Sequence, residues 1–297
     1  FKKRTKVVCQ IVKYTDPLEV RIIQVLGHPD DAGVDISAML TSNQVRQVFN
    51  GKIVKECKRI PTKVQKDELE NRKDLRNLLT VTIDGDDAKD FDDAISIVKN
   101  EKGYLLYVHI ADVSHYVKEN SALDQEAYLR GNSIYVCDRV VPMLPFDLSN
   151  GICSLNPNVD RLTITCAMQV DERGNLLTYN VFPSVIHSDK RCTYKKVNAC
   201  LAGDETILEE YSEVKGLLFT LESLAKLLKK QSHNRGCIDF NTKEAKIIMD
   251  KNGYPVDVTV LERGFAEQMI EEYMILANVC VAHHMHVNKI PSMYRVH

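Results

Sequence analysis

The chain has 297 residues, of which 44% are hydrophobic, 39 are basic and 41 are acidic, with 13 glycines, 9 prolines and 9 cysteines. This composition excludes a disordered chain, a collagen and a small disulfide scaffold, and at about 150 residues per domain the length fits roughly two domains. No apolar run approaches the ~18 residues of a membrane helix, and the first residues lack the apolar stretch of a signal peptide. We therefore expect a cytoplasmic protein that has no membrane partner.

The N-terminal quarter is basic and the remainder is acidic. Residues 1–78 carry a net charge of +6, and residues 79–297 carry −8. Apolar residues at 6–14 and 20–26 predict short strands of a small, incomplete β-barrel. A Gly-His-Pro-Asp-Asp turn follows them at 27–31. A helix is expected at about 43–50, followed by a charged linker, with the domain boundary near Arg76.

From residue 78 onward the pattern predicts a second, larger β-rich core with peripheral helices. Apolar or alternating runs at 78–83, 94–98 and 104–113 predict strands, and residues 161–186 predict a hairpin in which Gly174 supplies the positive φ of the loop. Apolar residues at three- and four-residue steps predict helices at 207–228, with Gly236 near the end, and at 265–286. The predicted fold class is mixed α/β.

The densest chemical feature is the acidic segment TIDGDDAKDFDD at 82–93, directly after a predicted strand. Like charges this close repel strongly unless a cation neutralises them. Carboxylate oxygens without cysteine or histidine favour Mg²⁺, Mn²⁺ or Ca²⁺ over zinc. An EF-hand loop is excluded because Ala88 and Lys89 occupy its fifth and sixth places. The remaining functional interpretation is a magnesium site for phosphoryl transfer, in which two ions activate a water and stabilise the leaving oxygen.

The alternative is a solvated acidic loop at the end of a strand. Phe91 and Ala94 lie among the acidic residues, and the apolar strand that follows would draw the loop against a core. A loop that is merely solvated does not need such an anchor. The histidines are expected to have structural roles. His109 and His115 lie in or beside a strand, and the helix dipole favours the HHMH group at 283–286 at a helix end.

Five ordered segments carry a family resemblance. They are TIDGDDAKDFDDAISI at 82–97, HIADVSHYV at 109–117, RGNSIYVCDRVVPMLPFDLSNGICSLNPNVDRLT at 130–163, RGCIDFNTKEAK at 235–246 and EEYMILANVC at 271–280. Together they resemble the catalytic domain of the RNase II/RNase R (RNB) family, nearest to its bacterial RNase R branch. The resemblance runs from about Asp74 to the last residue.

The resemblance implies a domain order and a reaction. Residues 1–41 would be the end of a cold-shock-type OB-fold, 42–77 a helix and charged linker, and 78–297 the catalytic RNB domain, truncated at its C-terminal end. The reaction would be Mg²⁺-dependent (Mn²⁺ possible), processive 3′ to 5′ hydrolysis of single-stranded RNA to nucleoside 5′-monophosphates. By position, the metal-binding and catalytic aspartates of the family fall on Asp84, Asp90, Asp92 and Asp93, with Asp93 the main candidate for catalysis.

The resemblance also implies RNA contacts. Tyr135 and Phe240 would stack on the terminal bases, and Arg130, Arg235 and Arg295 are candidates for phosphate contacts. Glu271 or Glu272 would contact the RNA sugar or a water in the active site; a surface ion pair is the alternative for either glutamate.

Two rival functions remain open at the level of sequence. One is a noncatalytic RNA-binding module that retains the acidic loop, and the other is a scaffold stabilised by divalent ions without a nucleic-acid partner. The sequence ends before an arginine-bearing segment that family members use at the phosphate, so this chain by itself is expected to bind metal weakly and to be impaired in hydrolysis. We expect a monomer without an obligate protein partner.

Overall fold

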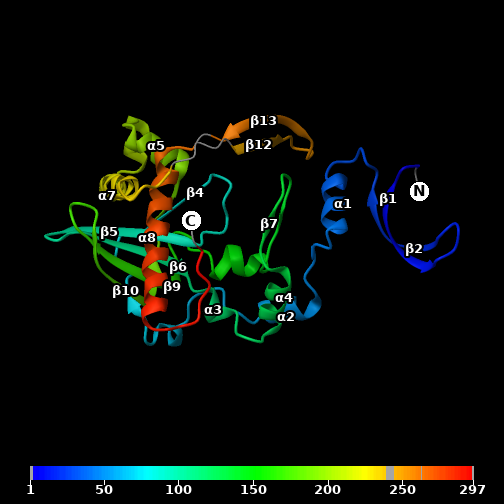
Figure 1. Cartoon of the computed structure of the whole chain (residues 1–297), viewed down its shortest axis with the longest axis horizontal. Coiled ribbons are helices and arrows are strands. Elements are labelled where there is room, and N and C mark those ends of the chain that lie inside the picture. The colour runs from blue at the N-terminus through cyan, green and yellow to red at the C-terminus, as the bar shows by residue number, and fades with distance from the viewer. Residues whose placement is uncertain (1–2, 239–243, 262, 296–297) are drawn as a thin grey trace. The chain divides into compact units, whose positions relative to one another are not determined.

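The computed structural model describes residues 3–238, 244–261 and 263–295, which form two compact units (Figure 1). Unit 1 contains residues 1–56, 120–145 and 242–262. Unit 2 contains residues 57–119, 146–241 and 263–297. Each unit is therefore assembled from three separate stretches of the chain.

The described residues of unit 1 form short helices and three small antiparallel ribbons. Strands β1 and β2 pair with each other, as do β7 with β8 and β12 with β13. The elements of this unit are β1 Lys6–Lys13, β2 Glu19–Gly27, α1 Val34–Ser42, α2 Gly51–Cys57, α4 Ala122–Arg130, β7 Ile134–Tyr135, β8 Val140–Val141, β12 Glu244–Met249 and β13 Pro255–Leu261. The two strands predicted at 6–14 and 20–26 are confirmed as β1 and β2.

The helix predicted at 43–50 is wrong, because these residues connect two helices. Helix α1 ends at Ser42, and Gln44 adopts a positive φ of 58°, which a right-handed helix does not allow. Helix α2 starts later, because the side-chain oxygen of Asn50 accepts hydrogen bonds from the N–H groups of Lys52 (3.0 Å) and Ile53 (3.2 Å). The capping chemistry of Asn50 thus determines where the second helix begins.

Unit 2 is built on a seven-stranded sheet in the described part of the chain, with the order β11-β4-β5-β6-β9-β10-β3. The strands from β4 through β10 pair antiparallel, whereas the two outer pairs, β11 with β4 and β3 with β10, are parallel. The bounds are β3 Lys73–Asp74, β4 Val81–Asp84, β5 Asp93–Asn100, β6 Gly103–Ala111, β9 Asp160–Val170, β10 Leu176–His187 and β11 Lys190–Thr193. The strands predicted after residue 78 are confirmed, as is the hairpin, whose Gly174 has a φ of 84°.

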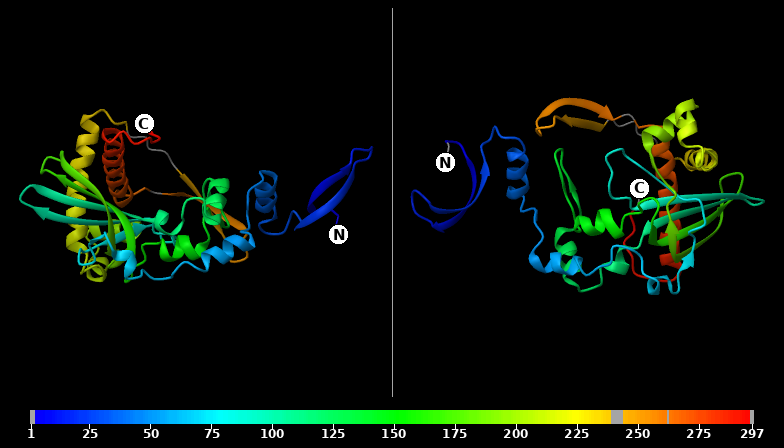
Figure 2. Two further views of the ribbon diagram at one scale, coloured as in Figure 1. Left: turned by 90° about the horizontal axis from the view of Figure 1, so that it is seen from below. Right: turned by 180° about the vertical axis from the view of Figure 1, so that it is seen from behind.

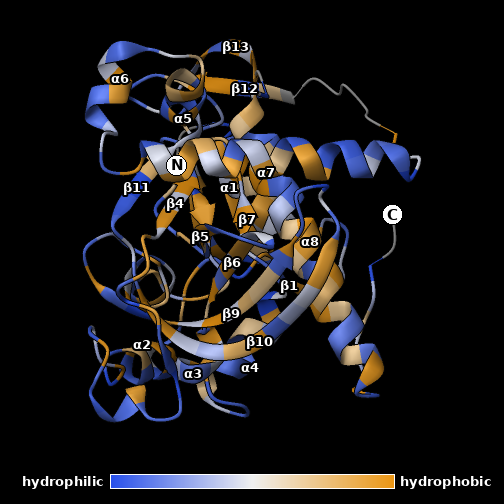
Figure 3. Cartoon of the chain, turned by 90° about the vertical axis from the view of Figure 1, so that its left-hand side faces the viewer, coloured by the Kyte–Doolittle hydropathy of each residue, from blue (hydrophilic) through white to orange (hydrophobic). Residues whose placement is uncertain are grey.

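Helices cover one face of this sheet (Figure 2). They are α5 Tyr194–Leu201, α6 Glu205–Glu210, α7 Lys215–Asn234 and α8 Phe265–Val287. Elsewhere in the unit lie the shorter α3 Val113–Tyr116, the 3₁₀ turn Asp67–Leu69 and the π-type turn Asp147–Ile152. The main hydrophobic core lies between the sheet and α5, α7 and α8, and Figure 3 shows the central strands β5 and β6 as mainly hydrophobic. Leu218, Leu221 and Tyr273 are fully buried there.

One predicted helix divides into two. The stripe at 207–228 continues as α6 and α7, because the chain turns at 211–214 before α7 begins. Tyr211 and Val214 are both 1% exposed, so this turn is itself packed into the core. The helix predicted at 265–286 is confirmed as α8, with Met269, Tyr273 and Cys280 buried along its stripe.

The opposite face of the sheet carries a buried polar ladder that runs from the start of β4 across β5, β6, β9 and β10. Its members are Thr80, Ser96, His109, Thr165 and Ser184, all 0% exposed. His109 bridges Ser96 through Nε2 (3.1 Å) and Thr165 through Nδ1 (2.7 Å). Burial lowers the pKa of His109 to about 3, so this imidazole is neutral, and its predicted structural role is confirmed.

No helix in the described residues is both long enough and apolar enough to cross a membrane.

A glycine substitution tests how closely β6 approaches the end of β9. Gly103 has a φ of 118°, and a Cβ placed on it would lie 2.4 Å from the carbonyl oxygen of Val170. Gly203 has a comparable positive φ of 89°, but a Cβ placed there would meet no atom within 4 Å. We expect Gly203→Ala to lower the free energy of unfolding by about 1 kcal/mol, from backbone strain alone. Gly103→Ala should lower it by at least twice as much in urea titrations, because the clash adds to the strain. Equal losses would contradict the close approach.

Candidate active site

The acidic residues lie where two neighbouring strands of unit 2 meet a common loop. Strand β4 ends at Asp84 and β5 begins at Asp93, so residues 85–92 form the connection, which we call the acidic loop. A turn at its start is closed by the N–H of Ala88, which donates to the carbonyl of Gly85 (3.2 Å). Asp84, Asp90 and Asp93 are half-buried. Four of the predicted site residues, including Asp92, thus lie within the segment from the end of β4 to the start of β5.

The second half of the loop is tied to the core through Phe91. This side chain is 3% exposed and packs in a hydrophobic cluster with Leu75 and Leu155. The N–H of Phe91 donates to Ser154 Oγ (2.9 Å), and its carbonyl accepts from the N–H of Leu155 (2.8 Å). The prediction that Phe91 holds the loop against a core is confirmed.

Arg191 of β11 contacts the first half of the loop. Its Nη2 donates to the carbonyl oxygens of Asp86 (2.8 Å) and Ala88 (3.1 Å), with a longer contact to Gly85 (3.4 Å). The guanidinium also lies over the ring of Phe91, 5.0 Å from its centroid. Sequence reasoning did not identify Arg191, because only the parallel pairing of β11 with β4 brings it to the loop.

The four carboxylates interact electrostatically. Burial, followed by the charges of Asp93, Asp92 and Asp90, raises the pKa of Asp84 to about 7, and Arg191 opposes this rise. Burial and then Asp92 raise the pKa of Asp93 to about 6, and partial burial and then Asp90 raise that of Asp92. Each of these three groups is therefore destabilised in its charged form by its surroundings.

A tyrosine of a neighbouring helix interacts electrostatically with this centre, and a glutamate of another helix interacts with that tyrosine. Burial, and then the charges of Asp84, Asp93 and Glu267, raise the pKa of Tyr194 to about 12. Tyr194 begins α5 directly after β11, and Glu267 lies in the first turn of α8, where Asn198 Nδ2 donates to it (3.0 Å). Neither residue could be assigned from the sequence, because helices distant along the chain bring them together.

The donor set fits a hard divalent cation. The facing groups are carboxylates, and Asp84 Oδ2 is buried without a hydrogen-bond partner in the described structure. However, within the described residues no three acidic, histidine or cysteine side chains are already gathered into the geometry of a metal site.

The predicted RNA-contacting residues Tyr135 and Arg130 lie in unit 1. Tyr135, in the β7–β8 ribbon, is 66% exposed. In contrast, the Arg130 side chain is 3% exposed: it donates to Glu126 (3.0 Å) and to the carbonyl of Pro142 (3.0 Å), and it stacks on Phe49 at 3.7 Å. The ring of Tyr135 is therefore accessible, whereas the side chain of Arg130 is buried in contacts within unit 1.

The other predicted contacts are in unit 2. Arg235, which follows α7, and Arg295 are exposed. Glu271 of α8 forms an ion pair with Arg263, consistent with the surface-pair alternative for this residue. Phe240 lies outside the described residues.

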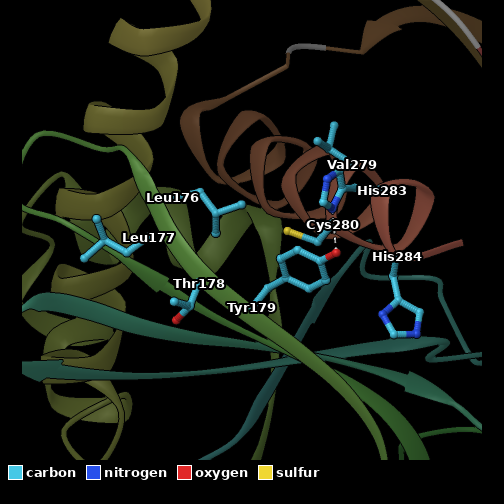
Figure 4. A pocket seen from close by; sticks show the side chains of 8 residues that line it. All are labelled: Leu176, Leu177, Thr178, Tyr179, Val279, Cys280, His283 and His284. Carbon is cyan, nitrogen blue, oxygen red and sulfur yellow. Dashed lines mark hydrogen bonds between the residues drawn. The ribbon is translucent and has the colours of Figure 1, made fainter. Parts of the chain in front are cut away.

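A separate pocket of about 560 Å³ lies between β10 and α8 (Figure 4). Leu176, Leu177 and Val279 form apolar walls, and Tyr179 and His283 are joined by a hydrogen bond between the hydroxyl and Nδ1 (2.7 Å). None of the acidic residues lines it. His283, at the end of α8, thus has a structural partner in Tyr179.

Comparison with known proteins identifies the family. The RNB domain matches residues 72–297, and the Cold shock domain matches residues 1–50. This chain belongs to the RNB domain family. It is 47% identical to Ribonuclease R of Thermotoga maritima, over 100% of this chain and 42% of that protein. The chain therefore spans less than half the length of this relative.

Solved structures agree with this assignment. The structure of Mycoplasma genitalium RNase R in complex with ribose-methylated single-stranded RNA matches with a TM-score of 0.90 and 36% identity, over 99% of this chain and 46% of that one. Yeast Ssd1, described as a pseudonuclease, shares the fold with a TM-score of 0.71 at 16% identity, over 96% of this chain and 35% of that one. The predicted fold class, a β-rich RNB core preceded by a partial cold-shock-type domain, is confirmed.

The raised pKa values predict that the metal-free acidic centre weakens the fold. Asp84 has a folded pKa of about 7 against an ordinary value of 3.8, so the folded chain holds more protons than the unfolded chain between these values. Stability therefore falls as pH rises through this window and stays low above it. Asp84→Asn should raise the free energy of unfolding by about 1 to 2 kcal/mol near pH 8, after allowing for solvent screening.

The same substitution should have a smaller effect near pH 5, because there Asp84 is still protonated in the folded chain and only the lower part of the window between the two pKa values has been crossed. Thermal unfolding in the presence of a chelator at both pH values measures this difference. Asp86→Asn is the matched control, because Asp86 is exposed and lies in the same loop. Equal stabilisation by Asp84→Asn at the two pH values would contradict the assigned electrostatics.

Proposed function

We propose that this chain is the catalytic part of a divalent-metal-dependent 3′ to 5′ exoribonuclease that degrades single-stranded RNA processively to nucleoside 5′-monophosphates. The observation that carries the proposal is that Asp84, Asp90, Asp92 and Asp93 lie along one strand–loop–strand segment, where burial and then the charges of the other three raise the pKa of Asp84. Membership of the RNB family and similarity to ribonuclease R relatives support the reaction class.

In this proposal the four aspartates hold Mg²⁺, or Mn²⁺ in its place. When bound, the ion supplies charge stabilisation at the phosphate and activates water. The protein must keep Asp84 and Asp93 ionised, and their raised pKa values mean that deprotonation is favoured by the ion or by alkaline pH. Phe91 and Arg191 fix the loop, so that the carboxylates do not have to be ordered anew when a substrate binds.

RNA binding in this proposal uses both units. Tyr135 presents an exposed ring for stacking, and Phe240 is its proposed partner. Arg235 and Arg295 are the accessible candidates for phosphate contacts, Arg130 would act by supporting unit 1, and Glu271 would meet the sugar after release from Arg263. The single-stranded RNA in the Mycoplasma genitalium RNase R complex supports this class of partner.

The domain boundaries are part of the same proposal: 1–41 for the cold-shock-type segment, 42–77 for the connection and 78–297 for the RNB domain. We also propose a monomer without an obligate protein partner that works in the cytoplasm. The rival function is a noncatalytic RNA-binding module, and it is favoured by one observation, the shared fold of a protein described as a pseudonuclease.

Asp93→Asn in the intact parent protein separates catalysis from binding. We expect hydrolysis of a 3′-tailed RNA to fall by at least about 100-fold, since metal-assisted charge stabilisation contributes several kcal/mol to such transition states. The affinity for RNA should be retained. Single-turnover cleavage and fluorescence anisotropy measure the two quantities, and Asp86→Asn, which alters the loop outside the proposed set, serves as control. A parent protein without any turnover would support the noncatalytic alternative.

Tyr135→Ala tests the proposed stacking platform. Loss of one base stack should weaken binding of a short single-stranded RNA by about 1 to 3 kcal/mol. Tyr128→Ala is a matched control in the same unit, because Tyr128 is 86% exposed and lies on the neighbouring α4. Anisotropy titrations at a fixed salt concentration compare the two variants, and an equal loss for both would remove Tyr135 from the site.

A further inference from the structure

Arg191 is placed by the register of a parallel strand pair. In the pairing of β11 with β4, Arg191 lies opposite Thr82, and Thr193 lies opposite Asp84. From this position a single nitrogen, Nη2, reaches the carbonyl oxygens of Gly85, Asp86 and Ala88. A single side-chain nitrogen of a neighbouring strand therefore contacts three carbonyl oxygens of one turn.

The same guanidinium also touches the far end of the acidic loop. Its Cζ lies 5.0 Å from the centroid of the Phe91 ring, a distance at which a cation is attracted to the face of an aromatic ring. Phe91 is itself held by Ser154 and Leu155. Arg191 thus lies between the turn that follows Asp84 and the anchor that precedes Asp92 and Asp93, and it connects the two halves of the loop.

This connection matters because the loop must hold like charges close together. Repulsion among the carboxylates favours open loop conformations, and ordering each loop residue costs about 1 to 2 kcal/mol of backbone entropy. Hydrogen bonds from a charged donor oppose both effects. The Nε of Arg191 is buried without a hydrogen-bond partner in the described structure, so the side chain gives up solvation to occupy this place.

We propose that Arg191 is a positioning residue of the acidic centre, which holds the backbone of residues 85–88 against Phe91 so that the aspartates at both ends of the loop can bind one divalent-cation site. The proposal rests on the proposed function, because it assumes that the aspartates bind a divalent cation. Arg191 would not touch the cation or the RNA.

A positioning role of Arg191 and a purely electrostatic role predict opposite changes in metal affinity. At a pH above the pKa of Asp84, where this carboxylate is already ionised, a guanidinium near the centre repels a divalent cation, so if its charge were all that mattered, removing it would tighten metal binding. If the loop depends on Arg191 for its shape, removing the side chain weakens metal binding, because the ion must then order the loop. The direction of the change in affinity therefore distinguishes the two roles.

Arg191→Met in the full chain is the direct test, with Mn²⁺ as the probe. We expect Mn²⁺ binding, measured by electron paramagnetic resonance of the free ion, to weaken about tenfold, which corresponds to about 1.4 kcal/mol. The amide hydrogens of residues 85–92 should exchange faster in the metal-free protein. Arg191→Lys keeps the charge and three donors, and should restore affinity to within about threefold of the unmodified chain.

Arg76→Met is the control for loss of an arginine elsewhere in unit 2, since Arg76 pairs with Asp74 and Asp160. It should leave Mn²⁺ affinity and loop exchange unchanged. Phe91→Leu keeps an apolar anchor but removes the ring face, and should speed exchange at 85–88, the turn on the other side of Arg191. If Arg191→Met does not fold, Phe91→Leu still tests whether Arg191 connects the two halves of the loop.

Equal or tighter Mn²⁺ binding by Arg191→Met, with unchanged exchange in the loop, would overturn the proposal, as would unchanged exchange at 85–88 in Phe91→Leu. Absence of even the weak Mn²⁺ binding expected of the unmodified chain would instead overturn the proposed function. In that case the exchange measurement, which needs no metal, still decides whether Arg191 holds the loop.

Discussion

The mutual repulsion of the carboxylates at the junction of β4 and β5 is the constraint on which the site depends. Four aspartates within one strand–loop–strand segment can remain near one another only if the rest of unit 2 holds the loop in place. Phe91 does this by burial and Arg191 by hydrogen bonds to the turn. Burial and then the charges of neighbouring aspartates raise the pKa values of Asp84 and Asp93 in the restrained loop. In the proposed function, such a centre trades stability for the ability to bind a cation.

The sheet of unit 2 supports this centre through two faces of different chemistry. One face is apolar and packs against α7 and α8, which gives the strands a rigid foundation. The other face carries the polar ladder through His109, whose hydrogen bonds link β5, β6 and β9 without introducing a charge. Because every member of the ladder is hydrogen-bonded, polar groups can be buried beside the strands that end at the site without a large desolvation penalty.

Much of the fold could be predicted from local patterns, and the errors occurred where local patterns compete. The strands, the hairpin at Gly174 and helix α8 follow from alternation, turn chemistry and the 3.6-residue period. The helix expected at 43–50 failed because Gln44 adopts a left-handed conformation and Asn50 caps the next helix instead. The helix expected at 207–228 failed as a single unit because the turn at 211–214 is buried, so tertiary packing outweighed periodicity.

For the site, the sequence by itself determined the acidic segment, its position after a strand and its anchor Phe91, because these depend on residues adjacent along the chain. Only the tertiary structure decided that Arg191 and Tyr194 lie near these carboxylates, that Glu267 lies near Tyr194, and that Arg130 packs inside unit 1. The physical reason is that parallel pairing of β11 with β4 and the packing of α8 join residues more than 100 positions apart. Contacts between such distant residues leave no periodic signal in a single sequence.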